Sequence, residues 1–277
     1  MLTLPNTFDF EGSAIKWGKM GAGPSLVLIH GTPFSSQVWR RILPHLIEHR
    51  TVYFYDLLGY GQSEKKADQD VSLGVQNRLL CALFKAWRLH RPDVVAHDFG
   101  GATALRGYFL DGLRFASLTI FDAVALAPWG SPFVQHVRQH ETAFAGMPAY
   151  MHRALLSAYL QTGAHNTLPP ETIEIYSAPW IGAIGQPAFY RQISQMDQIH
   201  TDEVEPLYRL LDCPVRVLWG REDDWIPAAQ GDALATLISS TSCTHIQGAG
   251  HLLQEDRPEA IVAAVLNQIQ TSALGRS

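Results

Sequence analysis

Short apolar runs that alternate with helical patterns constrain the fold of this chain more strongly than any other feature of its sequence. Several runs predict buried strands, because each is short, apolar and followed by a turn signal: Ser25–Gly31, Thr51–Gly61, Asp93–Asp98, Ser117–Val124, Pro214–Gly220 and Thr244–His251. The spacing of apolar residues predicts helices at Gly74–His90, Gly100–Leu110 and Glu259–Ile269. This alternation predicts an α/β fold with a mostly parallel central sheet and helices on both faces.

The segment from about Pro128 to Glu205 interrupts this alternation. Its periodicity is helical, it shows no clear strand, and it is rich in aromatic residues. It is also too long for a simple connection. We interpret residues 128–205 as a helical cap, or lid, inserted into a core domain of residues 1–127 and 206–277. The alternative is a set of ordinary packing helices, but a cap would lie over the strand ends, where α/β sheets bind their ligands.

Composition excludes several classes of protein. A chain of 277 residues that is 47% hydrophobic and 17% charged can build one large domain around a substantial core. The net charge of −5 gives no reason to expect a nucleic-acid partner. No apolar run reaches the roughly 18 residues that a membrane span needs. The first residues lack a basic region followed by an apolar run, so we expect no signal peptide.

The three cysteines bear on location and on metal binding. Cys81, Cys213 and Cys243 are odd in number and widely scattered. They fit buried thiols in a reducing cytoplasm better than a disulfide framework or a zinc site. We therefore expect a cytoplasmic protein that needs no metal or other cofactor.

The stretch VVAHDFGG, Val94–Gly101, has the form of a sharp turn between a strand and a helix. Small residues stand at Ala96, Gly100 and Gly101, where a nucleophile elbow needs them. Such an elbow lifts one side chain above the sheet, and in the pattern G-x-S-x-G that side chain is a serine. Here the position belongs to Asp98, so a carboxylate is expected to face a cavity.

Four motifs follow one another in an order that resembles a known superfamily. HGTPFSSQVWR starts at His30, DLLGYGQSEK starts at Asp56, AHDFGG carries Asp98, and WGREDDWIP, from Trp219, is followed by GAGHLLQEDRPE with His251. The order nucleophile, acid, histidine is that of α/β-hydrolases. The chain resembles this superfamily over nearly its whole length, least in the cap, and within it the branch of haloalkane dehalogenases and epoxide hydrolases. The resemblance implies the α/β-hydrolase fold and hydrolytic activity.

The resemblance and the residues together predict a triad of Asp98, His251 and Asp223. His251 follows an apolar strand and a Gly-Ala-Gly turn, which lets its ring reach across the top of the sheet. Asp223 matches the family spacing from Gly220, and its carboxylate would accept the Nδ1–H of the histidine and stabilise the imidazolium.

Alternatives exist for the acid and for the histidine. Asp122 ends an earlier strand, where some haloalkane dehalogenases carry their acid, and Asp224 is adjacent to Asp223. We favour Asp223 because the WGREDDWIP loop is intact, and we interpret Asp122 as a structural or hinge carboxylate. His97, next to the nucleophile, is expected to be a buried structural partner.

Two backbone groups are the expected oxyanion donors. The N–H of Phe99 lies at the start of the helix that leaves the elbow. The HGTP turn matches the oxyanion loop of the family and offers the N–H of Thr32, whereas Pro33 has none to give.

A carboxylate nucleophile narrows the chemistry to an electrophilic sp³ carbon. Attack by Asp98 on such a carbon gives an alkyl ester, which water activated by His251 can hydrolyse. The expected partner is therefore a small molecule such as an epoxide or an alkyl halide. Phe99 and Thr32 replace residues that help to bind halide or a substrate carboxylate in related dehalogenases, which favours an epoxide hydrolase, with a haloalkane or haloacid dehalogenase as the alternative. We rank a carboxylesterase or lactonase, and a non-catalytic binding protein, behind both.

The proton donor or leaving-group site is expected in the cap, where no motif selects a single residue. The candidates for substrate binding are aromatic residues and one histidine: Trp129, Tyr150, His152, Tyr176, Trp180 and Tyr190.

Overall fold

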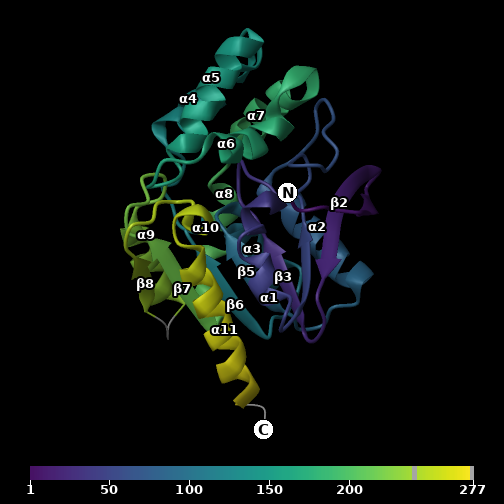
Figure 1. The fold of residues 1–277 in the computed structure, drawn as a ribbon, viewed down its shortest axis with the longest axis vertical. Coiled ribbons are helices and arrows are strands. Elements are labelled where there is room, and N and C mark those ends of the chain that lie inside the picture. Colours follow the sequence, from purple (N-terminus) through teal and green to yellow (C-terminus); the bar gives the residue numbers. More distant parts are fainter. Residues whose placement is uncertain (239–241, 275–277) are drawn as a thin grey trace.

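A single eight-stranded sheet forms the centre of the computed structural model, which describes residues 1–238 and 242–274. The strands are β1 (Asn6–Phe10), β2 (Ser13–Met20), β3 (Ser25–Ile29), β4 (Thr51–Tyr55), β5 (Asp93–His97), β6 (Ser117–Phe121), β7 (Val215–Gly220) and β8 (Cys243–Ile246). Their order is β1-β2-β4-β3-β5-β6-β7-β8 (Figure 1). Strands β3 to β8 pair in parallel, and β1 and β2 are antiparallel. The predicted mostly parallel sheet is confirmed.

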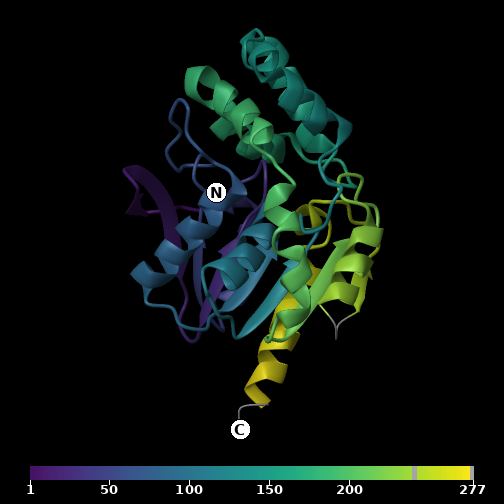
Figure 2. The same ribbon diagram turned by 180° about the vertical axis from the view of Figure 1, so that it is seen from behind.

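Helices cover both faces of the sheet (Figures 1 and 2). Helices α2 (Leu73–Trp87) and α3 (Phe99–Leu110) pack on each other over one face. On the other face, α11 (Pro258–Leu274) lies beside α1 (Leu43–Leu46). Helix α9 (Ala228–Leu237) packs on β7 and β8, while the short α10 (Leu253–Asp256) packs on the 3-10 helix η1 (Ser36–Trp39). No helix in the described ranges is both long and apolar enough to cross a membrane.

The sequence-based strands differ from the structure at both ends of the chain. Strands β1 and β2 were not predicted, because β1 alternates between partly buried and exposed positions, β2 mixes buried, partly buried and exposed ones, and neither forms an apolar run. The predicted strands Thr51–Gly61 and Thr244–His251 are too long. The first ends at Tyr55, ahead of Gly59 and Gly61, and the second ends at Ile246, ahead of Gly248. These three glycines adopt positive φ, which takes the backbone out of the strand conformation.

Helices alone connect β6 to β7. They are α4 (Pro132–Ala145), α5 (Ala149–Gln161), α6 (Pro170–Ser177), η2 (Ala178–Trp180), α7 (Gly182–Ser194), α8 (Ile199–Asp202) and η3 (Glu205–Leu210). Helices α4 and α7 pack side by side, and with α5 and α6 they stand above the carboxyl ends of the strands (Figure 1). The helical content of this segment agrees with the sequence pattern, and the division of the chain into a core and a cap stays a prediction.

The turn between β5 and α3 is strained and tightly enclosed. Asp98, its central residue, has φ 51° and ψ −119°, an unusual conformation for a residue with a side chain. A Cβ atom on Gly100 would lie 2.2 Å from the carbonyl oxygen of Ile29, and one on Gly101 would lie 2.6 Å from Cβ of Ala123. Only glycine fits at these two positions, which explains the small residues of the motif.

We expect Gly100→Ala to destabilise the fold by about 1–3 kcal/mol or more, because its new methyl group would meet backbone that cannot move away easily. Gly74→Ala in α2 is the matched control, since its methyl group would meet only side-chain ends, the nearest being that of His200 at 3.3 Å. Thermal unfolding monitored by circular dichroism would measure both. Equal melting temperatures for the two variants would contradict this account of the elbow.

Candidate active site

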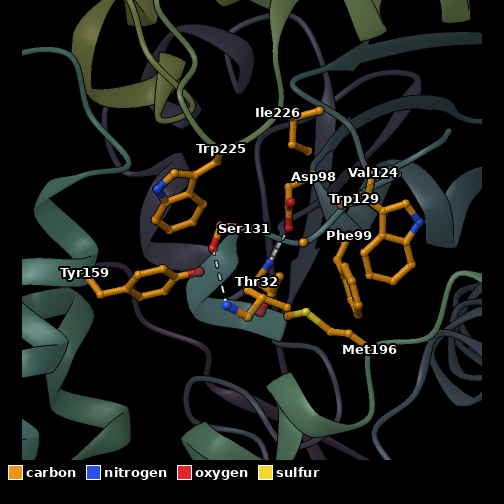
Figure 3. A pocket seen from close by; sticks show the side chains of 12 residues that line it. Thr32, Asp98, Phe99, Val124, Trp129, Ser131, Tyr159, Met196, Trp225 and Ile226 are labelled. Carbon is orange, nitrogen blue, oxygen red and sulfur yellow. Dashed lines mark hydrogen bonds between the residues drawn. The ribbon is translucent and has the colours of Figure 1, made fainter. Parts of the chain in front are cut away.

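The carboxylate of Asp98 stands at the carboxyl edge of the sheet, where two different groups meet it. It is 3% exposed. Its Oδ1 accepts a hydrogen bond of 2.6 Å from the backbone N–H of Thr32, in the loop after β3 (Figure 3). Its Oδ2 lies 3.4 Å from Nε2 of His251. The absence of a Cβ on Gly31 allows this approach, because a Cβ there would lie 2.3 Å from that of Asp98.

The imidazole of His251 connects Asp98 to a second carboxylate. Its Nδ1 lies 2.9 Å from Oδ2 of Asp223, and the ring is fully buried. The other oxygen of Asp223, Oδ1, accepts the backbone N–H groups of Trp225 (2.8 Å) and Ile226 (2.9 Å). These two bonds fix the orientation of the carboxylate and leave Oδ2 for the histidine.

Two carboxylates control the protonation of His251. Burial of the ring disfavours its charged form, but the charge and hydrogen bond of Asp223, together with those of Asp98, outweigh burial and raise the pKa of His251 well above its usual value. This shift favours the protonated ring between the two carboxylates, and the ring would release its proton more readily if either carboxylate lost its charge.

The neighbouring groups have structural contacts. Nε2 of His97 lies 3.0 Å from the backbone oxygen of His251, and burial lowers the pKa of His97 well below its usual value. The neutral ring of His97 thus donates to the loop that carries His251. Asp224 is exposed and stands outside this cluster.

The backbone groups expected to form an oxyanion hole flank Asp98. Thr32 already donates its N–H to the carboxylate. Phe99 is the first residue of α3, so its N–H belongs to the helix end that has no intrahelical acceptor. The role of these two groups as an oxyanion hole stays a prediction.

A small cavity of about 30 Å³ opens in front of Asp98. It admits water but not a drug-sized ligand. Its walls are largely apolar and include Phe99, Trp129 and Met196, while Tyr159 of α5 directs its hydroxyl toward the cavity (Figure 3). The cavity is therefore small and mainly apolar, with the carboxylate of Asp98 and a few hydroxyl groups on its walls.

Residues 26–264 match the model of the alpha/beta hydrolase family. The chain belongs to this family. The predicted resemblance to the superfamily and to its dehalogenase branch is confirmed, as is the α/β-hydrolase fold.

Individual relatives of this hydrolase are dehalogenases and proteins of the same fold. A haloalkane dehalogenase from Agrobacterium fabrum is 36% identical over 104 residues, which span 38% of this chain and 34% of that relative. A haloalkane dehalogenase from Mesorhizobium japonicum is 25% identical over 276 residues, or 91% and 87% of the two chains. The crystal structure of an alpha/beta hydrolase fold protein from Burkholderia ambifaria is 56% identical, covers 96% of this chain and 98% of that chain, and superposes with a TM-score of 0.94.

Of the six binding residues predicted from the sequence of the hydrolase, only Trp129 lines the cavity. Tyr150 is 75% exposed. His152 and Tyr190 are hydrogen-bonded to each other at 2.8 Å, and Tyr176 is bonded to Arg40 and Glu255. We therefore leave these four residues out of the proposed binding site, because their polar groups are already used or face solvent.

The indole N–H groups near the site also have acceptors of their own. Trp129 donates to Oγ1 of Thr201 (2.9 Å), and Trp180 donates to the backbone oxygen of Pro33 (2.7 Å). The hydrogen bond of Trp180 thus connects the helical segment to the loop that carries Thr32, and Trp180 does not line the cavity.

Sequence reasoning missed three residues of the site. Tyr159 and Trp225 line the cavity, and Trp225 stacks between Tyr159 (4.6 Å between ring centroids) and His251 (4.9 Å). Gln192 of α7 accepts hydrogen bonds from the hydroxyls of Thr32 (2.6 Å) and Tyr60 (3.0 Å). The position of Trp225 two residues after Asp223 was a usable signal, whereas no motif marks Tyr159 or Gln192.

Within the described ranges, one group of side chains has the types and spacing of metal ligands. Asp232, Cys243 and His245 lie on α9 and β8 with their ligand atoms within 4.8 Å of one another. Nε2 of His245 is already paired with Asp232 at 2.9 Å, and none of the three residues lines the cavity.

We expect Asp98→Asn to lower the pKa of His251 by about one unit or more, because one of its two negative neighbours is removed. The pKa of His251 is higher in the folded than in the unfolded protein. The ion pairs of His251 therefore contribute their full stabilisation at pH values below the unfolded pKa, and they lose it as the pH rises through the folded pKa. The variant should therefore lose more stability at pH 6 than at alkaline pH. NMR titration of the imidazole and thermal melts across pH measure the two effects.

The control for this experiment is Asp93→Asn. Asp93 is also a buried carboxylate, but it starts β5 and so lies at the opposite end of that strand from Asp98. An unchanged His251 titration in Asp98→Asn, or an equal shift in both variants, would contradict the ion pair between Asp98 and His251.

Proposed function

We propose that this hydrolase uses Asp98 as a nucleophile on an electrophilic sp³ carbon and hydrolyses the resulting ester with water activated by His251. The observation that carries the proposal is the environment of the Asp98 carboxylate. One oxygen is bonded to the N–H of Thr32, and the other lies against the imidazole of His251. A carboxylate attacking a carbonyl would give an anhydride, whereas attack on a saturated carbon gives an ester that water can cleave.

The two oxygens of Asp98 have different tasks in this mechanism. Oδ2 has no backbone donor and attacks the carbon, displacing the leaving group. Oδ1 becomes the carbonyl oxygen of the ester while it keeps its bond to Thr32. When water attacks the carbonyl carbon, negative charge develops on Oδ1, where the N–H groups of Thr32 and Phe99 stabilise it.

Formation of the ester also turns His251 into a base. In the resting site the charges of Asp223 and Asp98 hold its pKa high. Alkylation removes the charge of Asp98, so the pKa of His251 falls and the ring can accept a proton from water. Asp223 stays ionised through both steps and stabilises the imidazolium that forms again.

The cavity supports an epoxide as substrate. An opening epoxide needs a donor for its oxygen, and Tyr159 presents a hydroxyl to the cavity. Burial, followed by the charge of Asp98, raises the pKa of Tyr159 above its usual value, so the hydroxyl stays protonated. Phe99 offers no donor to a halide, and the indoles of Trp129 and Trp225 are bonded to Thr201 and Thr162.

A dehalogenase is the second candidate, favoured by the haloalkane dehalogenases among the relatives. In that case the hydroxyl of Tyr159 would be the donor for the departing halide. For either reaction we propose that residues 128–205 act as a cap, because α5 supplies Tyr159 and the segment between β6 and α4 supplies Trp129 and Ser131. Ester hydrolysis ranks behind both reactions.

A single turnover in heavy-oxygen water tests the covalent step. We expect the first product to be unlabelled and Asp98 to gain the label, because the carboxylate supplies the product oxygen and water then attacks its carbon. Mass spectrometry of the product and of the peptide that carries Asp98 measures both. Label that appears directly in the product would mean that water attacks the substrate.

Replacement of the base should trap the intermediate. His251→Gln leaves the attack by Asp98 possible but removes the group that activates water, so we expect an alkylated Asp98 to accumulate in intact-protein mass spectra. Turnover should fall by roughly 10³-fold or more. Turnover at the native rate would remove His251 from the mechanism.

The rates on two substrate classes, and the effect of removing the Tyr159 hydroxyl, test the choice of an epoxide as substrate. We expect the wild-type protein to form diols from small epoxides faster than it releases halide from bromoalkanes of equal chain length. Tyr159→Phe should lower epoxide opening by about 10²-fold, because the proton donor is lost. Tyr190→Phe is the control, since that hydroxyl is bonded to His152 outside the cavity. Halide release by the wild type with no diol from any epoxide would identify a dehalogenase instead.

A further inference from the structure

Asp122 is a buried carboxyl group that the proposed mechanism does not use. It directly follows β6, is fully buried, and has φ 43°. Its Oδ1 accepts the backbone N–H of Gly220 at 2.7 Å. Its Oδ2 is buried and finds no N–H or O–H donor in the part of the chain that the structure describes. Gly220, whose N–H this carboxyl accepts, accepts the backbone N–H of Asp223 on its own carbonyl oxygen at 3.3 Å, so the two aspartates lie at the same turn, and Asp223 is the other carboxyl group that acts on Asp122.

Two adjacent buried carboxyl groups cannot both be ionised at little cost. The backbone N–H groups of Trp225 and Ile226 and the ring of His251 all donate to Asp223, whereas Asp122 accepts a single N–H. The negative charge therefore belongs on Asp223. A protonated Asp122 has a hydrogen to donate, and its contact with Asp223 then becomes a hydrogen bond instead of a repulsion.

We propose that Asp122 is a positioning residue that stays protonated and donates its carboxyl O–H to Asp223, fixing the carboxylate that orients His251. Asp223 then has a donor on every side: two backbone N–H groups, the imidazole and the carboxyl of Asp122. The effect on catalysis rests on the proposed function, while the protonation of Asp122 does not.

The other groups around Asp122 agree with this assignment. Burial, and then the charge of Asp223, raise the pKa of Asp122 well above its usual value, while the nearby charge of His251 opposes them. The thiol of Cys243 on β8 also interacts with Asp122, and burial raises its pKa to about 12, so it brings no negative charge. An ionised Asp122 would be a further negative charge near His251 and would raise the pKa of the imidazole further, which would make the ring a poorer base for water. A neutral Asp122 avoids this effect.

Matched substitutions separate a hydrogen-bond donor from a charge. Asp122→Asn keeps the shape and an N–H donor, so we expect kcat within about twofold of the wild type and an unchanged midpoint for the low-pH limb of the rate profile. Asp122→Ala loses the donor and should lower kcat by about tenfold. Asp223→Asn should cost far more than either. Thermal melts identify any variant that fails to fold, and Asp93→Asn serves as the control for a buried carboxylate elsewhere.

Two outcomes of the kinetic experiment would overturn the proposal. If Asp122 were ionised, Asp122→Asn would remove a negative charge near His251, and the midpoint of the low-pH limb would fall by about one unit or more. If Asp122 were the acid that orients His251, Asp122→Asn would be as damaging as Asp223→Asn.

A spectroscopic experiment decides the proposal without any substrate. Infrared spectra at neutral pH should show the carbonyl stretch of a protonated carboxyl group in the wild type and in Asp93→Asn, and this band should vanish in Asp122→Asn. Absence of the band from the wild type, or its persistence in Asp122→Asn, would overturn the proposal. A protein that shows the band but turns over no epoxide, halide or ester would instead contradict the proposed function and leave the assignment of Asp122 intact.

Discussion

The imidazole of His251, held between the carboxylates of Asp98 and Asp223, is the interaction on which the rest of this site depends. Burying three ionisable groups together is costly unless their charges and hydrogen bonds are matched. The matching is supplied by the backbone: Thr32 donates to Asp98, and Trp225 and Ile226 donate to Asp223. Because each backbone donor has its own acceptor, the two carboxylates have fixed orientations, and Oδ2 of Asp98 is left facing the imidazole of His251.

The strained elbow and the helices above it serve this network in different ways. The elbow places Asp98 at the sheet edge at the cost of an unusual backbone conformation, which close packing around Gly100 and Gly101 maintains. The helical segment makes two hydrogen bonds with one loop: Trp180 donates to Pro33, and Gln192 accepts from Thr32. The loop that carries Thr32 is thus held both from the sheet and from the helices above it.

Much of the fold followed from local patterns, and the failures have a common cause. Buried parallel strands show as apolar runs, because both of their faces are covered, whereas the edge strand β1 and its antiparallel neighbour β2 are only partly buried and show no such run. Asp98, Asp223 and His251 were identified by motifs in chain order, and the structure brings them within hydrogen-bonding or ion-pair distance. The residues of the helical segment that line the cavity were mostly missed, since a helical pattern does not show which aromatic residue faces the cavity and which packs inside.

The sequence by itself determined the parallel strands β3 to β8, the elbow with its obligatory glycines, and the identity of the three residues that meet at the sheet edge. These features depend on contacts between neighbours in the chain or on motifs of fixed spacing. Only the tertiary structure decided that Tyr159 rather than Tyr150 lines the cavity with Asp98, that the indoles of Trp129 and Trp180 are already bonded, and that Asp122 and Asp223 meet the same residue, Gly220. Those outcomes depend on how distant segments pack, because a side chain's partners are set by the elements that approach it in space.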